Sequence, residues 1–298
     1  MEEKSICGIC RGDFCDFEFR CGHFFHEECL KSWKKDINEC PYCRSEMSGS
    51  KELEAIIKSS FDGSMKNIES YDLKNLELLL KHACYSKTIT SIPTKNILTR
   101  IVELGWNLKT LQVSLYGVCS SGNIKLLNEF IEVEENLKGL AFLLPVACGN
   151  GHLDIVNRLI ELGVDVNAKV KDGKTALHHA CKNAHLNIVN RLIEHGVDVN
   201  AKENDGKTAL HYACDNGNLD IVNRLIELGV DVNTCAEDGK NALHEACSEG
   251  HLDIVNRLIE LGVDVNAKSN KGKTAIHFAQ RNGNLDIVNR LMELDSCL

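Results

Sequence analysis

The segment Gly151-His-Leu-Asp-Ile-Val-Asn-Arg-Leu-Ile160 decides the fold, because it recurs almost unchanged along the second half of the chain. Each copy begins 33 residues after the last, and the later copies begin at Ala184, Gly217, Gly250 and Gly283. A second block, Asp172-Gly-Lys-Thr-Ala-Leu-His178, has the same period and recurs from Asp205, Asp238 and Lys271. A fixed period of this length is typical of stacked repeats, in which each unit buries its apolar face against its neighbours.

Each unit is predicted to form two short helices. Apolar residues fall at positions i, i+1, i+4 and i+5, which share one helical face. They are Ala176, Leu177, Ala180 and Cys181 in the first helix, and Ile155, Val156, Leu159 and Ile160 in the second. A residue with a side-chain oxygen precedes each first helix as its N-cap: Thr175, Thr208, Asn241 and Thr274. A glycine ends each second helix: Gly163, Gly196, Gly229 and Gly262.

Other positions of the unit are predicted to be structural. The charged residues Asp154, Arg158 and Glu161 of the second helix are three and four apart and are expected to form a solvated face. One histidine next to each cap is expected to hydrogen-bond within the scaffold: His178, His211, His244 and His277. One cysteine per unit is expected to be a small buried apolar residue: Cys84, Cys119, Cys148, Cys181, Cys214 and Cys247.

These blocks resemble ankyrin repeats, with alanine after the threonine where that family usually has proline. The pattern weakens upstream, where Leu143-Leu-Pro-Val-Ala-Cys148 has Phe142 in place of the capping threonine. The expected architecture is an all-α ankyrin solenoid over residues 74–298, with the first two or three units degenerate. The seven expected units are 74–107, 108–138, 139–171, 172–204, 205–237, 238–270 and 271–298.

The first 44 residues contain eight cysteines and histidines at metal-ligand spacings: Cys7, Cys10, Cys21, His23, His26, Cys29, Cys40 and Cys43. Eight sulfur and nitrogen donors make two tetrahedral zinc sites. A segment of this size buries too little apolar surface to fold alone, so two structural zinc ions are expected. Sequential and interleaved pairing of the ligands both give two Cys3His sites, so ligand type does not choose between them.

This spacing resembles a RING finger with two central histidines, a small α+β zinc domain with a cross-brace, expected over residues 1–47. The resemblance implies the ligand sets Cys7, Cys10, His26 and Cys29 for one zinc ion and Cys21, His23, Cys40 and Cys43 for the other. It also implies an apolar platform for a ubiquitin-conjugating enzyme, formed by Ile9, Trp33 and Pro41. Arg44, directly after the last ligand, corresponds to the cationic linchpin that bridges the conjugating enzyme and ubiquitin.

The chemistry implied by this resemblance is that of a RING-type ubiquitin-protein ligase. A conjugating enzyme carries ubiquitin as a thioester, a substrate lysine attacks it, and the RING restrains ubiquitin in a reactive pose. The ligase has no nucleophile of its own, so Cys15 is expected to be a bystander. The alternatives are a non-catalytic adaptor that binds through its zinc module, and an ankyrin inhibitor of another enzyme.

The protein substrate is expected on the concave face of the ankyrin array. Comparison of the repeats shows variation directly after the repeat histidine, at His179, Tyr212, Glu245 and Phe278. The helix ends and the turn tips, such as Glu203-Asn204, vary as well. Tyr212 and Phe278 are the hypothetical anchors, since aromatic residues dominate binding hot spots. Neutral drift after duplication would produce the same variation.

Composition limits the remaining partners and the compartment. A formal net charge of −9 argues against nucleic acid and anionic membrane surfaces as partners. No apolar run approaches the roughly 18 to 20 residues of a membrane span. Cysteines used as metal ligands and buried apolar residues fit the cytoplasm, a reducing compartment. Residues 48–73 are expected to be a linker that could form one short helix.

Overall fold

A computed structural model of the chain describes residues 17–18, 24–25, 76, 77, 80, 84, 94–105, 108–133 and 142–295. The chain divides into two compact units, Met1–Leu79 and Leu80–Leu298. In the first unit, strand β1 (Phe17–Glu18) pairs antiparallel with β2 (Phe24–Phe25), with Phe17 opposite Phe25. The rest of the predicted cross-brace lies outside the described residues, as does the predicted linker, and both stay predictions together with the domain boundaries.

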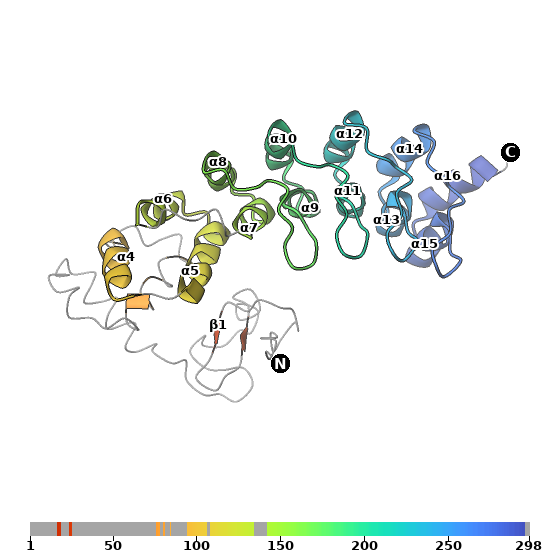
Figure 1. The fold of residues 1–298 in the computed structure, drawn as a ribbon. Coiled ribbons are helices and arrows are strands. Elements are labelled where there is room, and N and C mark those ends of the chain that lie inside the picture. Colours follow the sequence, from red (N-terminus) through yellow and green to blue (C-terminus); the bar gives the residue numbers. More distant parts are fainter. Residues whose placement is uncertain are drawn as a thin grey trace. The chain divides into compact units, whose positions relative to one another are not determined.

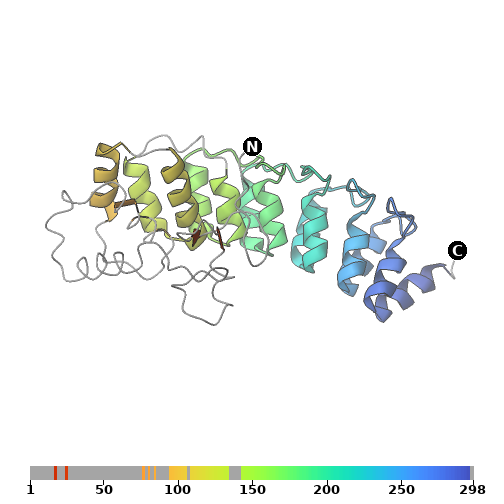
Figure 2. The same ribbon diagram turned by 90° about the horizontal axis from the view of Figure 1, so that it is seen from below.

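The second unit is a stack of paired helices, which is the solenoid that the repeats predict (Figure 1). The first helices of successive units are α5 (Leu108–Ser121), α7 (Leu143–Gly149), α9 (Ala176–Lys182), α11 (Ala209–Asn216), α13 (Ala242–Glu249) and α15 (Ala275–Asn282). The second helices are α4 (Thr94–Glu103), α6 (Ile124–Val133), α8 (Leu153–Glu161), α10 (Leu186–Glu194), α12 (Leu219–Glu227), α14 (Leu252–Glu260) and α16 (Leu285–Asp295). Figure 2 shows these helices standing side by side along the stack.

The core lies between the two rows of helices, because both helices of a unit turn their apolar face inward. Leu177 and Cys181 of α9 and Ile155 and Leu159 of α8 are at most 1% exposed. Ile160, predicted on the same face, is only half-buried. The six repeat cysteines are buried as predicted and have free thiols. Burial raises the pKa of Cys119 and of Cys247 to about 12, so these thiols stay protonated.

The predicted helix ends are confirmed. Gly163, at φ +76°, follows the last turn of α8, where its N–H donates to the carbonyl of Ile160 at 2.9 Å. The N–H of Val164 donates to the carbonyl of Leu159 at 3.1 Å, so the last carbonyls of the helix are satisfied by a Schellman motif. Among the described residues, no helix is long and apolar enough to cross a membrane.

Candidate functional site

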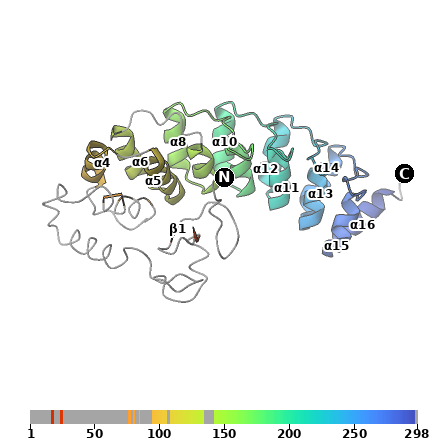
Figure 3. The same cartoon turned by 60° about the horizontal axis from the view of Figure 1, so that its bottom comes forward.

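The four variable positions that follow the repeat histidines lie on consecutive first helices. His179 belongs to α9, Tyr212 to α11, Glu245 to α13 and Phe278 to α15. These helices pack directly against one another in that order, so the four positions form one row across the stack (Figure 3). The row is one part of the predicted substrate site; the variable helix ends and turn tips are also described by the structure.

Tyr212 is held by a charged network rather than projecting alone. Its hydroxyl donates to Glu203 Oε1 at 2.7 Å, and the ammonium groups of Lys174 and Lys207 lie 6.0 Å and 5.9 Å from the ring centroid. Burial and then the Glu203 carboxylate raise the pKa of Tyr212, so the phenol stays protonated and keeps donating. Half-buried Tyr212 can therefore offer a partner its ring, while its hydroxyl is engaged within the array.

Two glutamates at predicted variable positions are buried. Glu245 is 5% exposed, and its Oε1 lies 2.8 Å from Lys207 Nζ and 3.9 Å from Lys240 Nζ. Burial alone would lower the pKa of Lys207, but the neighbouring Glu245 carboxylate raises it, so the ammonium group of Lys207 stays charged. Glu203, at a turn tip, is 7% exposed and lies 3.2 Å from Lys174 Nζ. These carboxylates fix the lysines between units and present little surface to a partner.

The turn tips offer a partner only part of their surface. The first residue packs inward in three of the four tips, since Glu203, Ala236 and Ser269 are all at most 7% exposed, whereas Val170 is half-buried. Each also closes its own turn, as the N–H of Glu203 donates to the carbonyl of Lys207 at 3.0 Å. Their second residues, such as Asn204, are exposed. Of the two variable residues in each of these three tips, only the second is therefore open to a partner.

The two ends of the row differ in chemistry. Phe278 packs edge-on against His244, with ring centroids 5.4 Å apart, and has Lys240 Nζ 5.6 Å from its centroid. At the other end, burial lowers the pKa of His179 to about 4, so its imidazole is neutral at physiological pH. Its Nε2 is buried with no hydrogen-bond partner in the described part of the chain.

The repeat histidines have the structural role that was predicted. His178 Nδ1 accepts from the backbone N–H of Thr175 at 3.1 Å and lies 2.8 Å from its hydroxyl. Because a backbone N–H only donates, Nδ1 has no proton, and Nε2 donates to the carbonyl of Lys207 at 3.3 Å. His211 repeats these bonds with Thr208 and Lys240. His178 and His211 therefore cap their own helices and tie them to the next hairpin.

The second helices carry a contact that was not predicted from the sequence. On the predicted solvated face, Arg158, Arg191 and Arg224 form i,i+3 ion pairs with Glu161, Glu194 and Glu227. Each arginine Nε also donates to an asparagine of the preceding unit: Arg158 to Asn128, Arg191 to Asn157, Arg224 to Asn190, Arg257 to Asn223 and Arg290 to Asn256. We call this series of arginine–asparagine bonds the ladder. The Asn-Arg dipeptide that recurs in every repeated block is the sequence pattern that could have predicted it.

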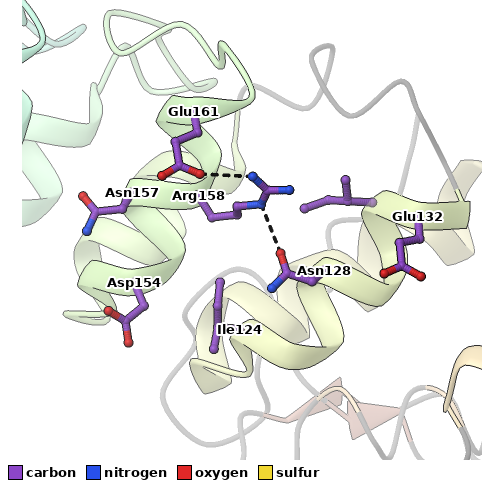
Figure 4. A pocket seen from close by; sticks show the side chains of 8 residues that line it. Ile124, Asn128, Glu132, Asp154, Asn157, Arg158 and Glu161 are labelled. Carbon is purple, nitrogen blue, oxygen red and sulfur yellow. Dashed lines mark hydrogen bonds and ion pairs between the residues drawn. The ribbon is translucent and has the colours of Figure 1, made fainter.

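A pocket of about 550 Å³ lies where the ladder begins, between α6 and α8 (Figure 4). Arg158 crosses it, donating to Asn128 Oδ1 at 3.1 Å and to Glu161 at 3.0 Å. Ile124 lines one side of it and Asp154 another. It contains none of the predicted site residues, and its central guanidinium already uses two of its five N–H donors in these bonds.

Comparison with known families explains both parts of the chain. Residues 115–203, 144–236 and 228–297 match the ankyrin-repeat family, and together these matches span more than half of the chain. The chain belongs to the ankyrin-repeat proteins. Residues 5–44 match the RING finger domain, so this ankyrin-repeat protein also carries a RING finger at its N-terminus.

Curated relatives of this ankyrin-repeat protein match it over short segments. An E3 ubiquitin-protein ligase of Oryza sativa subsp. japonica is 38% identical over 47 residues, which are 14% of this chain and 12% of the relative. E3 ubiquitin-protein ligase rnf8-A of Xenopus laevis is 36% identical over 76 residues, 25% of this chain and 14% of the relative. Autophagy-related protein 36 of Komagataella phaffii is 43% identical over 51 residues, 16% and 11% of the two chains. This chain thus spans between 11% and 14% of the length of these relatives.

The predicted residues of the RING finger lie outside the part of the chain that the structure describes. These are the eight zinc ligands, the platform residues Ile9, Trp33 and Pro41, and Arg44. Among the described residues, no group of histidine, cysteine, aspartate and glutamate could hold a metal ion. RING fingers bind zinc in general, and the eight predicted donors are cysteines and histidines, the residue types that bind zinc.

Proposed function

We propose that this protein is a RING-type ubiquitin-protein ligase whose ankyrin repeats recruit the substrate. The observation that carries the proposal is the complete set of eight ligands at RING spacing within residues 5–44, accompanied by Ile9, Trp33, Pro41 and Arg44. Relatives named E3 ubiquitin-protein ligases support the family-level activity. The repeats support recruitment, because they present a row of variable side chains on a constant scaffold.

The donor set fits two structural zinc ions. Six thiolates and two imidazoles are the ligands that zinc prefers, and four donors complete each tetrahedron. In this proposal one ion is held by Cys7, Cys10, His26 and Cys29, and the other by Cys21, His23, Cys40 and Cys43. The ions hold the fold together and take no part in the transfer, so the reacting groups come from the conjugating enzyme and the substrate.

The ligase then acts by positioning. Ile9, Trp33 and Pro41 would form an apolar surface for a conjugating enzyme charged with ubiquitin. Arg44, with several N–H donors in a fixed plane, would hold ubiquitin against that enzyme, a task for which lysine is a poorer substitute. Restricting ubiquitin to reactive poses lowers the entropic cost of attack by the substrate lysine. A reducing compartment, such as the cytoplasm, is part of the proposal because the ligand thiols must stay reduced.

The test is a reconstituted ubiquitination assay with the full zinc-loaded chain, activating enzyme and a panel of conjugating enzymes. Wild type is expected to form ubiquitin chains, and Ile9→Ala and Arg44→Ala are expected to lose most of that activity while retaining both zinc ions. Cys15→Ala is the matched control and should keep full activity. Absence of chains with every conjugating enzyme, from protein shown to hold two zinc ions, would favour an adaptor that only binds.

A further inference from the structure

Four charged side chains lie exposed at the ends of the first helices. Several nearby charged residues of the array form ion pairs, as Arg191 does with Glu194 and Lys207 with Glu245. We call the four residues the first-helix charge row: Lys182 on α9, Asp215 on α11, Glu249 on α13 and Arg281 on α15. All four are exposed, and none forms an ion pair with any described residue.

The helix ends that carry this row are tied to one another. Asn216 Nδ2 donates to the carbonyl of Lys182 at 2.9 Å, and Asn282 Nδ2 donates to the carbonyl of Ser248 at 2.7 Å. His251 Nε2 lies 3.1 Å from the carbonyl of Asp215, which links the two central units. The four charges are therefore carried on a fixed frame, in the order positive, negative, negative, positive. Lys182, Asp215 and Arg281 occupy equivalent positions of their units, and Glu249 lies one residue further along its helix.

The middle of the row has an excess of negative charge. Burial, followed by repulsion from Glu245 and Glu249, raises the pKa of Asp215 despite the opposing effect of Lys207 and Lys182. Glu245 is already neutralised by Lys207 at 2.8 Å, whereas Asp215 and Glu249 have no cation of their own among the described residues. A partner that brings positive charge to the centre would relieve this repulsion.

We propose that the first-helix charge row binds an extended segment of the substrate that carries two basic residues flanked by two acidic ones. Neighbouring packed helices are about 8 to 10 Å apart. A chain in the extended polyproline II conformation advances about 3.1 Å per residue with three residues per turn, so charges at every third residue lie on one face and match this spacing. The recognised pattern is acidic-x-x-basic-x-x-basic-x-x-acidic. The surface is complementary to a peptide of zero net charge. Recognition therefore depends on the order of the charges along the peptide and not on its total charge. This inference rests on the proposed function, in that it identifies the segment as part of a ubiquitination substrate.

The probe is a pair of labelled peptides of identical composition. One has the matched order, Glu-Ser-Ala-Arg-Ser-Ala-Arg-Ser-Ala-Glu, and the other has the inverted order, Arg-Ser-Ala-Glu-Ser-Ala-Glu-Ser-Ala-Arg. Fluorescence anisotropy with the full chain at low salt should give about 10-fold tighter binding of the matched peptide, as expected for several exposed ion pairs acting together. The preference should shrink as salt is raised, since exposed pairs are screened.

A charge-swapped variant makes the test specific to this row. The variant Lys182→Glu, Asp215→Lys, Glu249→Lys, Arg281→Glu keeps the net charge and should reverse the preference, so that the inverted peptide binds more tightly. The matched control swaps four exposed and unpaired residues elsewhere, Lys202→Glu, Asp220→Lys, Asp253→Lys, Lys271→Glu, and should keep the wild-type preference. Equal affinity of wild type for the two peptides, no binding of either, or reversal in the control variant as well would overturn the proposal.

The same proteins are assayed for ubiquitin chains without peptide. Chains from wild type and from the charge-swapped variant, combined with no peptide preference, would refute the charge row and leave the ligase intact. A peptide preference that reverses in the variant, in protein that forms no chains, would refute the ligase and leave the row as a peptide-binding surface.

Discussion

Residues 5–44 contain eight predicted metal ligands, each present once, whereas residues 172–295 repeat one pair of helices at intervals of 33 residues. In the first region no ligand has a substitute, because a zinc site with three protein donors is an open site rather than a structural one. In the second region the same contacts occur between every pair of neighbouring units, so each contributes a small part of the stability. One region should fail as a whole, and the other should lose stability in increments.

The largest expected effect is therefore the removal of zinc. A strong chelator, or Cys29→Ser, should abolish ubiquitin-chain formation, since structural zinc contributes on the order of 10 to 16 kcal/mol to such a domain. The helical signal of the array in circular dichroism should remain. Cys235→Ser, which changes an exposed thiol outside the ligand set, is the control. Loss of the helical signal in step with zinc release would show that the two regions do not fold independently.

The next effect concerns a single core contact of the array. Leu210 of α11 is 1% exposed, and Leu210→Ala should lower the free energy of unfolding by about 2 to 5 kcal/mol through the cavity it leaves. Leu285 begins α16 and is 69% exposed, so Leu285→Ala should change stability by less than about 0.5 kcal/mol. Urea unfolding followed by circular dichroism measures both. Similar losses from the two substitutions would contradict this assignment of the core.

Much of the array could be predicted because its decisive features are local in sequence. The capping position of Thr175, the C-terminal glycine Gly163 and the buried face of each helix follow from the spacing of residues within one unit. The Arg191–Asn157 bond joins residues 34 apart, and Glu203 and Glu245 are buried by lysines of other segments. Those contacts form only when the units stack. The variation between repeats therefore does not reveal which variable residues are exposed and which are buried.

Two substitutions between units are linked, one at the glycine before the second helix and one at the histidine of the next unit. Gly151, at φ +79°, lies under the imidazole of His185, and an added Cβ would lie 2.7 Å from that ring. Ala184 occupies the equivalent position at φ 59°, and the residue of the next unit is Asn218, whose side chain accepts from the N–H of Ile221 at 3.0 Å. The histidine is thus absent where the glycine is absent.

This pairing predicts a non-additive result. Asn218→His alone should push an imidazole against the Cβ of Ala184 and lower stability by about 1 to 3 kcal/mol, as overpacking does. Ala184→Gly together with Asn218→His recreates the Gly151–His185 arrangement and should recover most of that loss. A double-mutant cycle by urea unfolding gives the coupling energy. Additive effects of the two substitutions would mean that the residues do not meet.

The smallest expected effect separates two bonds of one side chain. Arg224 donates from Nε to Asn190 Oδ1 at 3.2 Å in the neighbouring unit and from Nη1 to Glu227 at 2.9 Å in its own helix. The first bond is partly buried and joins two units, so Asn190→Ala should cost about 0.5 to 1.5 kcal/mol. The second is an exposed pair, with Glu227 63% exposed, so Glu227→Gln should cost no more than about 0.5 kcal/mol. Raising the salt concentration should reduce the loss of unfolding free energy caused by Glu227→Gln, because this substitution removes a charge. The loss caused by Asn190→Ala should not change with salt. The opposite order of the two costs would mean that the array is held by pairs within helices and not by bonds between units.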